Sequence, residues 1–477
     1  MAENLEALAA QARLDLARLN QPAANWVPAS AGPDGRPLLD ALIVGGGMCG
    51  QTAAFALLRE GVRNLRCVDR APYAGEGPWT TFARMDILRS PKHLTGPDLG
   101  VPSLTYRAWH EAKFGVEHWQ KLHKIDRLEW ARYLLWVRET AGIQIENEVE
   151  VQSLELAAGA VRATLNTKHL IHARKVVLAL GREGSGAPRW PAFATFDPAK
   201  RGKNVFHAAD EIDFGKLKGK RIGVLGAGAS AFDNAGLALE AGAKQVVMFA
   251  RRPILPQVNK SKWTAFPGFQ HGYASLDDAR RWRFYSYIFS EQVPPPYESV
   301  LRCERHAGFS LIFGTTWQDI FPEREGVRIA TQKGEHRFDA VIVCTGFDVN
   351  LTDRPEIASF RDSIETWRSH VPAHEAEKYP EEARFPYLGS SFELISKTQE
   401  LSGALGRIHV FNWGCTMSHG ALAGDIPGLE TGARRLANGI VRDLFVEDAD
   451  RHWMCLQEHN EDELRPTSYF VPLGERK

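Results

Sequence analysis

Apolar and polar positions follow one pattern twice along the chain, in residues 38–70 and in residues 219–252. Each segment starts with a short apolar run, passes through a glycine-rich turn into an alanine-rich stretch with helical spacing, and ends on a second apolar run. This order is typical of a strand, a helix and a second, parallel strand packed together. The pattern therefore predicts an α/β fold that contains two such units.

The segments around these units predict how they are connected. Residues 143–180 alternate apolar and polar positions, which indicates antiparallel strands returning to a buried strand at 175–180. Glycine and proline in 181–191 indicate a linker, and a further apolar strand is expected at 338–347. We therefore expect the second unit to be inserted into a domain built from both ends of the chain. The predicted parts are an N-terminal helical extension (1–37), a first domain (38–189 and 336–477), and an inserted domain (190–335) with a helical, aromatic-rich insertion (259–320).

Composition excludes several classes of partner. The 477 residues include 58 Lys and Arg against 58 Asp and Glu, so no net positive field favours nucleic acid or an anionic membrane. No apolar run approaches the roughly 18 residues of a membrane span, and the N-terminus lacks the basic start and apolar core of a secretory signal. The six cysteines are scattered without a CxxC pair, which argues against structural zinc and favours a reducing compartment. We expect a cytoplasmic protein.

The first glycine turn, Gly45-Gly46-Gly47-Met48-Cys49-Gly50, satisfies the pattern GxGxxG directly after an apolar strand. Such glycines allow a tight turn, a close approach of backbone to a pyrophosphate, and close packing of helix on strand. An acid roughly 20 residues later, at the end of the next strand, accepts the ribose hydroxyls of a dinucleotide. The predicted cofactor contacts are Gly45, Gly47, Met48, Cys49, Gly50, Asp69 and Arg70.

The second turn has the variant GxGxxA, and its second strand ends in two arginines rather than an acid. A carboxylate there would repel the 2′-phosphate of NADPH, whereas guanidinium groups bind phosphate with paired donors. We therefore expect this unit to bind NADPH and the first unit to bind FAD, with hydride passing between them. The predicted NADPH contacts are Gly226, Gly228, Ala229, Ser230, Ala231, Arg251 and Arg252.

The two turns, the linking segments at 175–184 and 339–347 and the inserted domain resemble the flavoproteins with two dinucleotide-binding domains. Within that group the chain is similar to the flavin-dependent monooxygenases of class B, which comprise flavin-containing, Baeyer–Villiger and N-hydroxylating enzymes. Residues 127–137 and Ser418-His419-Gly420 resemble segments of the N-hydroxylating branch. The resemblance implies an enzyme that uses FAD, NADPH and O2 to insert one oxygen atom into a small organic substrate through a peroxyflavin intermediate.

Relatives of this kind wrap the flavin with the segment that corresponds to residues 75–100. By that resemblance Trp79 is expected to form a wall of the flavin site. A reactive flavin–oxygen adduct persists only where water is excluded and hydrogen-bond donors surround it. The candidate catalytic donors are Arg89, Ser90, Lys92 and His419.

Two alternatives stay open at this stage. The chain could be an NADPH-dependent flavin oxidoreductase or oxidase that passes electrons on without inserting oxygen, or a noncatalytic flavoprotein. An NADPH site argues against the noncatalytic alternative, because a passive binder needs no hydride donor. The sequence leaves open the substrate, the oxygenated atom (N, S or C) and the oligomeric state.

Overall fold

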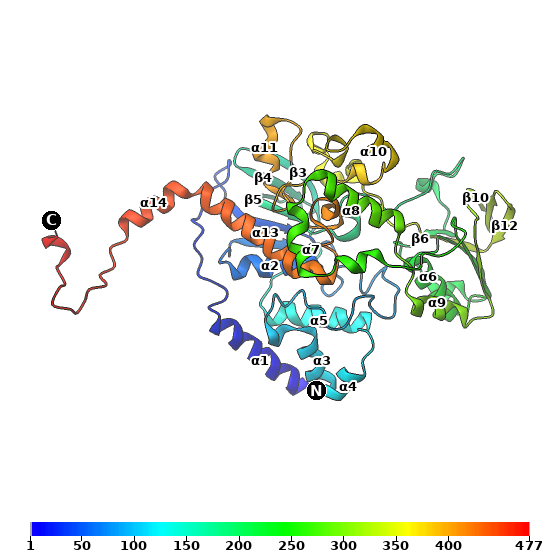
Figure 1. Cartoon of the computed structure of the whole chain (residues 1–477), viewed down its shortest axis with the longest axis horizontal. Coiled ribbons are helices and arrows are strands. Elements are labelled where there is room, and N and C mark those ends of the chain that lie inside the picture. The colour runs from blue at the N-terminus through cyan, green and yellow to red at the C-terminus, as the bar shows by residue number, and fades with distance from the viewer. Residues whose placement is uncertain (1, 477) are drawn as a thin grey trace.

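The computed structural model describes residues 2–476, and it contains a six-stranded and a five-stranded sheet (Figure 1). In the six-stranded sheet the order is β2-β1-β5-β4-β3, and β14 pairs with β5. The strands β2, β1, β5 and β14 run parallel, whereas β3, β4 and β5 form the antiparallel meander expected from the alternating pattern. The strands are β1 (Leu39–Val44), β2 (Leu65–Val68), β3 (Val151–Ala157), β4 (Ala160–Leu165), β5 (Leu170–Leu178) and β14 (Ile408–Val410).

The five-stranded sheet has the order β6-β13-β7-β8-β9, with every pair parallel. Its strands are β6 (Val205–His207), β7 (Arg221–Leu225), β8 (Gln245–Phe249), β9 (Phe309–Ile312) and β13 (Ala340–Val343). A separate antiparallel sheet lies beside it, formed by β10 (Trp317–Glu323), β11 (Gly326–Thr331) and β12 (Gly334–Phe338).

Strand β13 corrects the predicted boundary between the two domains. The sequence placed residues 336–477 with the first domain, but β13 pairs with β6 and β7 in the second sheet. A buried, wholly apolar strand fits the middle of either parallel sheet, so its sequence did not distinguish them. The second unit therefore extends at least to Val343, and β14 supplies the late strand of the first sheet instead.

Helices cover both sheets and bury their apolar faces. Helix α13 buries Leu429, Leu436 and Ile440 and packs against α2, which lies on the first sheet. Helices α6 and α9 pack together on the second sheet, and Asp126 caps α5 by accepting from Leu128 and Glu129 N–H groups. The bounds are α2 (Met48–Arg59), α5 (Arg127–Thr140), α6 (Ala229–Glu240), α9 (Tyr297–Glu304), α11 (Gln399–Leu405), α13 (Ile426–Glu447) and α14 (Ala449–Glu458).

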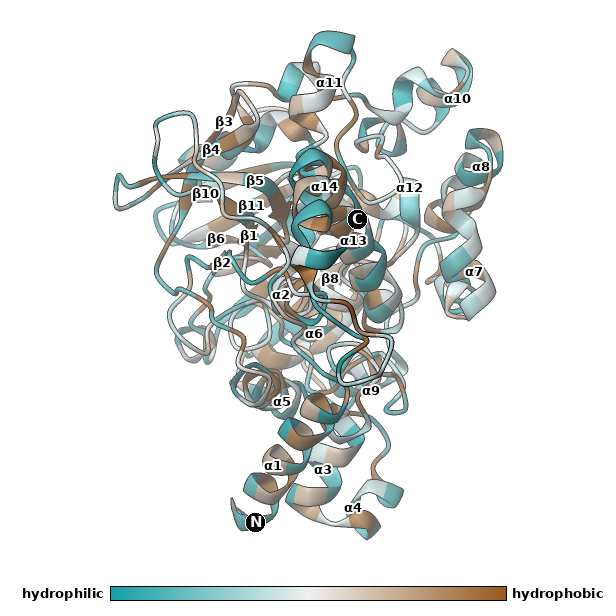
Figure 2. Ribbon diagram, turned by 90° about the vertical axis from the view of Figure 1, so that its left-hand side faces the viewer, coloured by the Kyte–Doolittle hydropathy of each residue, from teal (hydrophilic) through white to brown (hydrophobic). Residues whose placement is uncertain are grey.

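The N-terminal extension begins with helix α1 (Ala2–Arg18), whereas residues 19–37 are not helical. Helix α1 packs against α3, and Ser103 donates a hydrogen bond to the Asp15 carboxylate at 2.7 Å. Figure 2 shows apolar and polar residues interleaved along this helix and along α3, as befits helices with one buried face. The helices are α1 (Ala2–Arg18), α3 (Tyr106–Phe114) and α4 (Val116–Lys121).

The aromatic-rich insertion forms mostly hydrophobic core. Trp282 and Tyr285 pack with Trp367 and Phe385 in a separate cluster formed with the segment after β13. The last part of residues 259–320 belongs elsewhere, because α9 and β9 are elements of the second unit. The helices of this cluster and of the loop beside it are α7 (Pro267–Gly272), α8 (Asp278–Glu291), α10 (Ala373–Lys378) and α12 (Thr416–His419).

Among residues 2–476, none of the helices has the length and apolar character needed to cross a bilayer. Within the same residues, His, Cys, Asp and Glu side chains form no group of three or more that could hold a metal ion. The six cysteines are free thiols, of which Cys455 alone is exposed.

Candidate active site between the two glycine turns

The first glycine turn brings β1 and α2 into direct contact. A Cβ atom at Gly50 would lie 1.7 Å from the Gly45 carbonyl oxygen, and one at Gly45, where φ is +99°, would lie 2.6 Å from the Ala179 carbonyl oxygen. Gly47 caps α2 without a side-chain hydrogen bond, so the first N–H groups of the helix have no cap. Free N–H groups and the positive end of a helix dipole form a phosphate site.

Asp69 lies at the end of β2 and is bonded to this turn. Its carboxylate accepts from the Gly46 N–H at 2.6 Å and from the Ala71 N–H at 2.7 Å. Burial raises the pKa of Asp69, although the two backbone donors act in the opposite direction. The neighbouring Arg70 points to Glu183, with 2.6 Å between Nη2 and Oε1. The structure thus brings Asp69 to the turn and pairs Arg70 with the linker.

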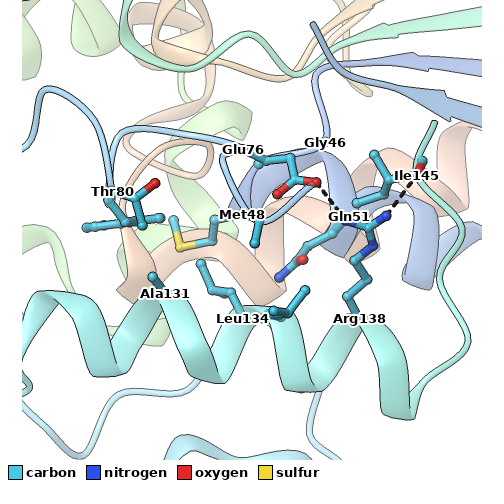
Figure 3. A pocket seen from close by; sticks show the side chains of 13 residues that line it. Gly46, Met48, Gln51, Glu76, Thr80, Ala131, Leu134, Arg138 and Ile145 are labelled. Carbon is cyan, nitrogen blue, oxygen red and sulfur yellow. Dashed lines mark hydrogen bonds and ion pairs between the residues drawn. The ribbon is translucent and has the colours of Figure 1, made fainter. Parts of the chain in front are cut away.

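A pocket beside the turn contains two buried donors without acceptors (Figure 3). Gln51 Nε2 and Trp79 Nε1 have no hydrogen-bond partner among the described residues. A buried polar group without a partner costs about 1–3 kcal/mol, and a dinucleotide carries many acceptor oxygens and nitrogens. A pair formed by Glu76 and Arg138, 2.6 Å apart and each 9% exposed, borders the same pocket. These residues therefore fit FAD.

The loop that carries Trp79 is fixed to both nucleotide-binding units. Arg127, the first residue of α5, donates to the carbonyl groups of Trp79 and Met85. Arg84 in the same loop donates to the carbonyl oxygens of Ala208 and Asp210, each at 2.6 Å, in the second unit. Arg127, the first residue of the segment 127–137, thus holds this loop beside the first turn.

Arg89 lies where the two units meet. Its side chain is accessible to solvent. Neighbouring protein atoms lower the pKa of its guanidinium group, Asp233 of α6 and Asp425 raise this pKa, and Arg182 of the linker lowers it. Ser90 beside it is half-buried. The structure therefore brings Arg89 and Ser90 to the junction of the units.

Lys92 is not brought to this junction. Its ammonium group donates to the Trp119 carbonyl oxygen at 2.6 Å and lies 4.8 Å from the centroid of that indole ring. These contacts hold Lys92 at the end of α4, where an ammonium group stabilises the last carbonyls of a helix. We leave Lys92 out of the proposed site.

His419 is buried in a complete set of contacts. Its Nε2 lies 2.8 Å from the Gly389 carbonyl oxygen, its Nδ1 lies 3.2 Å from Arg435 Nη1, and its ring is 4.1 Å from that of Phe392. The carbonyl requires a proton on Nε2 and the guanidinium requires a lone pair on Nδ1, so the ring is neutral. Burial and Arg435 lower its pKa to about 3. We therefore assign His419 a structural role and leave it out of the catalytic set.

This assignment predicts a stability effect rather than a catalytic one. Because the folded pKa lies below the ordinary histidine value of about 6.5, His419 contributes stability that is complete above pH 6.5. That stability is lost as pH falls towards 3, by up to about 1.4 kcal/mol per pH unit. In a His419→Gln variant we expect the thermal midpoint to fall less steeply between pH 6.5 and 4.5, with an unchanged pH profile of kcat. Loss of an ionisation from the kcat profile would contradict the structural role.

The second glycine turn is open to solvent. Nothing lies within 4 Å of a Cβ built on Gly228, and Ser230 is exposed at the start of α6. Arg251 and Arg252 follow β8 at the same sheet edge; Arg251 is exposed, and Arg252 donates to the Ser290 carbonyl oxygen at 3.2 Å. The structure thus brings the predicted NADPH contacts of turn and strand end together.

Asp425 is a candidate that sequence reasoning missed. It precedes α13 as the N-cap residue, but its side chain makes no capping hydrogen bond. The backbone N–H of the preceding Gly424 donates a hydrogen bond to the Cys49 sulfur at the start of α2, so the N-termini of α2 and α13 lie together. The sequence does show an aspartate after a glycine and directly before an Ile-Pro start of a helix. Only the strand order, however, shows that this aspartate lies beside the first turn.

Comparison with known proteins agrees with this geometry. The family described as FAD-NAD(P)-binding matches residues 42–183. The FAD-dependent urate hydroxylase of Xanthomonas campestris pv. campestris is 38% identical over 439 residues, which is 91% of this chain and 92% of that protein.

Solved structures share the fold at low sequence identity. An ornithine N-hydroxylase from Kutzneria sp. 744, solved with reduced FAD, NADP+ and L-ornithine, has a TM-score of 0.65 at 14% identity and covers 85% of this chain and 100% of that one. A flavin-containing monooxygenase from Stenotrophomonas maltophilia has a TM-score of 0.56 at 16% identity and covers 85% and 98%.

The predictions of two dinucleotide-binding units, FAD, NADPH and a monooxygenase reaction are confirmed, and nothing favours the oxidase alternative. The enzyme uses NADPH and O2 to oxygenate a small organic substrate. The chain belongs to the flavin-dependent monooxygenases, in the family of the FAD-dependent urate hydroxylase.

Proposed function

We propose that this chain hydroxylates urate or a closely similar oxopurine. The observation that carries the proposal is the 38% identity to a urate hydroxylase along nearly the whole of both chains. The charge of Arg89 is compatible with it, because this accessible guanidinium group has no hydrogen-bond partner within residues 2–476 and is influenced by groups of both units. A cation there favours an anionic substrate and disfavours a cationic amine such as ornithine or lysine.

Each part of the proposed site binds a different part of the two cofactors. The N–H groups at the start of α2 bind the FAD pyrophosphate, Asp69 accepts its ribose hydroxyls, and Gln51 and Trp79 donate to its remaining acceptors. The second turn binds the NADPH pyrophosphate, and Arg251 and Arg252 bind the 2′-phosphate. Bound FAD supplies hydride acceptance and the reaction with O2.

The loop of Trp79 and Arg89 has a further proposed task, which is to close the space between the units. Arg84 and Arg127 bind it on either side, so it excludes water without a large motion. Arg89 donates hydrogen bonds to the substrate oxygens. Ser90 follows Arg89 directly in the sequence. Because NADPH is an intracellular reductant and five of the six thiols are buried and free, we propose that the enzyme acts in the cytoplasm.

The experiment measures urate-dependent turnover by the purified flavoprotein. The balanced reaction converts urate, O2, NADPH and H+ into hydroxylated urate, NADP+ and water. We expect urate to accelerate NADPH oxidation at least tenfold and one atom of 18O2 to enter the product, as mass spectrometry would show. Ornithine and lysine serve as control substrates. NADPH oxidation that urate does not accelerate, with all oxygen recovered as peroxide, would refute the proposal.

A further inference from the structure

Arg182 lies at the edge of the first sheet that carries the glycine turn. It follows β5, whose parallel neighbours β1 and β14 lead into the Gly45 turn and into Trp413. Neighbouring strands lie about 4.8 Å apart, so Arg182 and Trp413 share one edge with that turn. In open α/β sheets ligands bind outside the carboxyl ends of the strands. Arg182 is therefore placed at a ligand-binding edge.

Trp413 holds the guanidinium group of Arg182 in place without using its donors. The guanidinium carbon lies 3.9 Å from the Trp413 ring centroid, and the indole packs in turn on Phe289, with 5.9 Å between ring centroids. A guanidinium over an aromatic face keeps its N–H groups directed outward in its own plane. The side chain is exposed, and no hydrogen-bond or carboxylate partner for it occurs within residues 2–476.

A second unpaired guanidinium group lies nearby. Arg89 likewise has no hydrogen-bond or carboxylate partner in the described part of the chain, and the charged groups that influence its pKa are Asp233, Arg182 and Asp425. The neighbouring Asp233 accepts from Ser299 Oγ at 2.6 Å instead of pairing with either arginine. Both guanidinium groups therefore have donors that are free for a ligand.

We propose that Arg182 binds the anionic edge of the substrate, with Trp413 fixing the plane of its guanidinium group. The chemical class this fits is a planar oxopurine anion, whose adjacent oxygen and nitrogen acceptors match the paired donors of a guanidinium fork. The inference rests on the proposed function and deepens it. The phosphates of both dinucleotides have other partners, namely the N–H groups of the two turns and the arginines after β8.

The test compares Arg182→Ala and Arg182→Lys with the wild-type flavoprotein. For Arg182→Ala we expect the Kd and the KM of urate to rise roughly 30-fold, as for loss of charged hydrogen bonds. Arg182→Lys keeps the charge but lacks the paired donors of a guanidinium group, so its Kd and KM for urate should lie between those of the wild type and those of Arg182→Ala. FAD content and the KM of NADPH should stay within about twofold of wild type.

Arg328→Ala is the matched control. Arg328 is stacked in the same way, 4.0 Å from the Phe321 ring centroid, but its donors already pair with Glu323 and Glu335. Its loss should change none of these quantities. The comparison separates the loss of a stacked arginine from the loss of unpaired donors.

Three results would overturn the inference. An unchanged Kd of urate in Arg182→Ala would remove Arg182 from the substrate site. A loss of FAD or a raised KM of NADPH would assign its guanidinium to a cofactor phosphate. If the wild-type enzyme neither binds nor oxidises urate, the proposed function fails, and benzoate then serves as the planar anion, followed by the flavin spectrum. Benzoate binding that is equal in wild type and Arg182→Ala would refute the anion site as well.

Discussion

Replacing Gly50 with alanine is expected to yield a protein that retains no FAD on purification. The added methyl carbon would lie 1.7 Å from the Gly45 carbonyl oxygen and 2.8 Å from its carbon. Both atoms are backbone, in the turn that must present its N–H groups to the pyrophosphate. Overpacking of this kind costs about 3 kcal/mol or more when nothing flexible can yield, which corresponds to an affinity for FAD roughly 100-fold weaker.

The chain contains its own control for this substitution. The second turn has Ala231 at the corresponding position, fully buried at the start of α6, so a methyl group there is compatible with that unit. Gly228→Ala meets no atom within 4 Å and should leave FAD content unchanged.

The measurement is the molar ratio of flavin to protein after purification, with circular dichroism and NADP+ affinity as checks that Gly50→Ala is folded. Full flavin content in a folded Gly50→Ala protein would show that the first turn does not hold the cofactor.

The two nucleotide-binding units could be predicted because their signals are local. A glycine turn between a strand and a helix, such as that around Gly45, belongs to a segment of only about 30 consecutive residues. The contacts that require its glycines lie within that segment. The Arg251-Arg252 pair is read in the same way from the end of the next strand. The structure confirms both units because strand, turn and helix are adjacent in sequence as well as in space.

The remaining features depend on contacts between distant segments. An apolar strand such as β13 fits either parallel sheet, and only its pairing with β7 decides between them. Lys92 and His419 have residue types suited to catalysis, but Trp119 and Gly389 respectively accept their hydrogen bonds.

Asp425 and Arg182 were missed for the opposite reason. Each stands in a glycine-rich loop without a motif, and each reaches the junction only because β5 is a parallel neighbour of both β1 and β14. Sheet order, which single-sequence patterns do not specify, thus decides which polar loops form the site.

Removing both arginines after β8 is expected to change the coenzyme preference of the enzyme. In Arg251→Ala/Arg252→Ala we expect the KM of NADPH to rise roughly 100-fold, because each charged hydrogen bond to phosphate is worth about 1.5–3 kcal/mol. NADH lacks the 2′-phosphate, so its KM should change less than about threefold. Arg251, exposed and without a hydrogen-bond partner in residues 2–476, should account for the larger share, since Arg252 also donates to the Ser290 carbonyl.

The single variants and salt dependence make this prediction specific. Binding of a phosphate by guanidinium weakens with ionic strength, so the KM of NADPH should rise with added salt in wild type and much less in the double variant. The measurement is the initial rate of flavin reduction under anaerobic conditions with each coenzyme, which isolates hydride transfer from the oxygen reaction. Equal losses with NADPH and NADH would show that these arginines support the second unit as a whole, and would assign recognition of the 2′-phosphate to other residues around the open turn at Gly228.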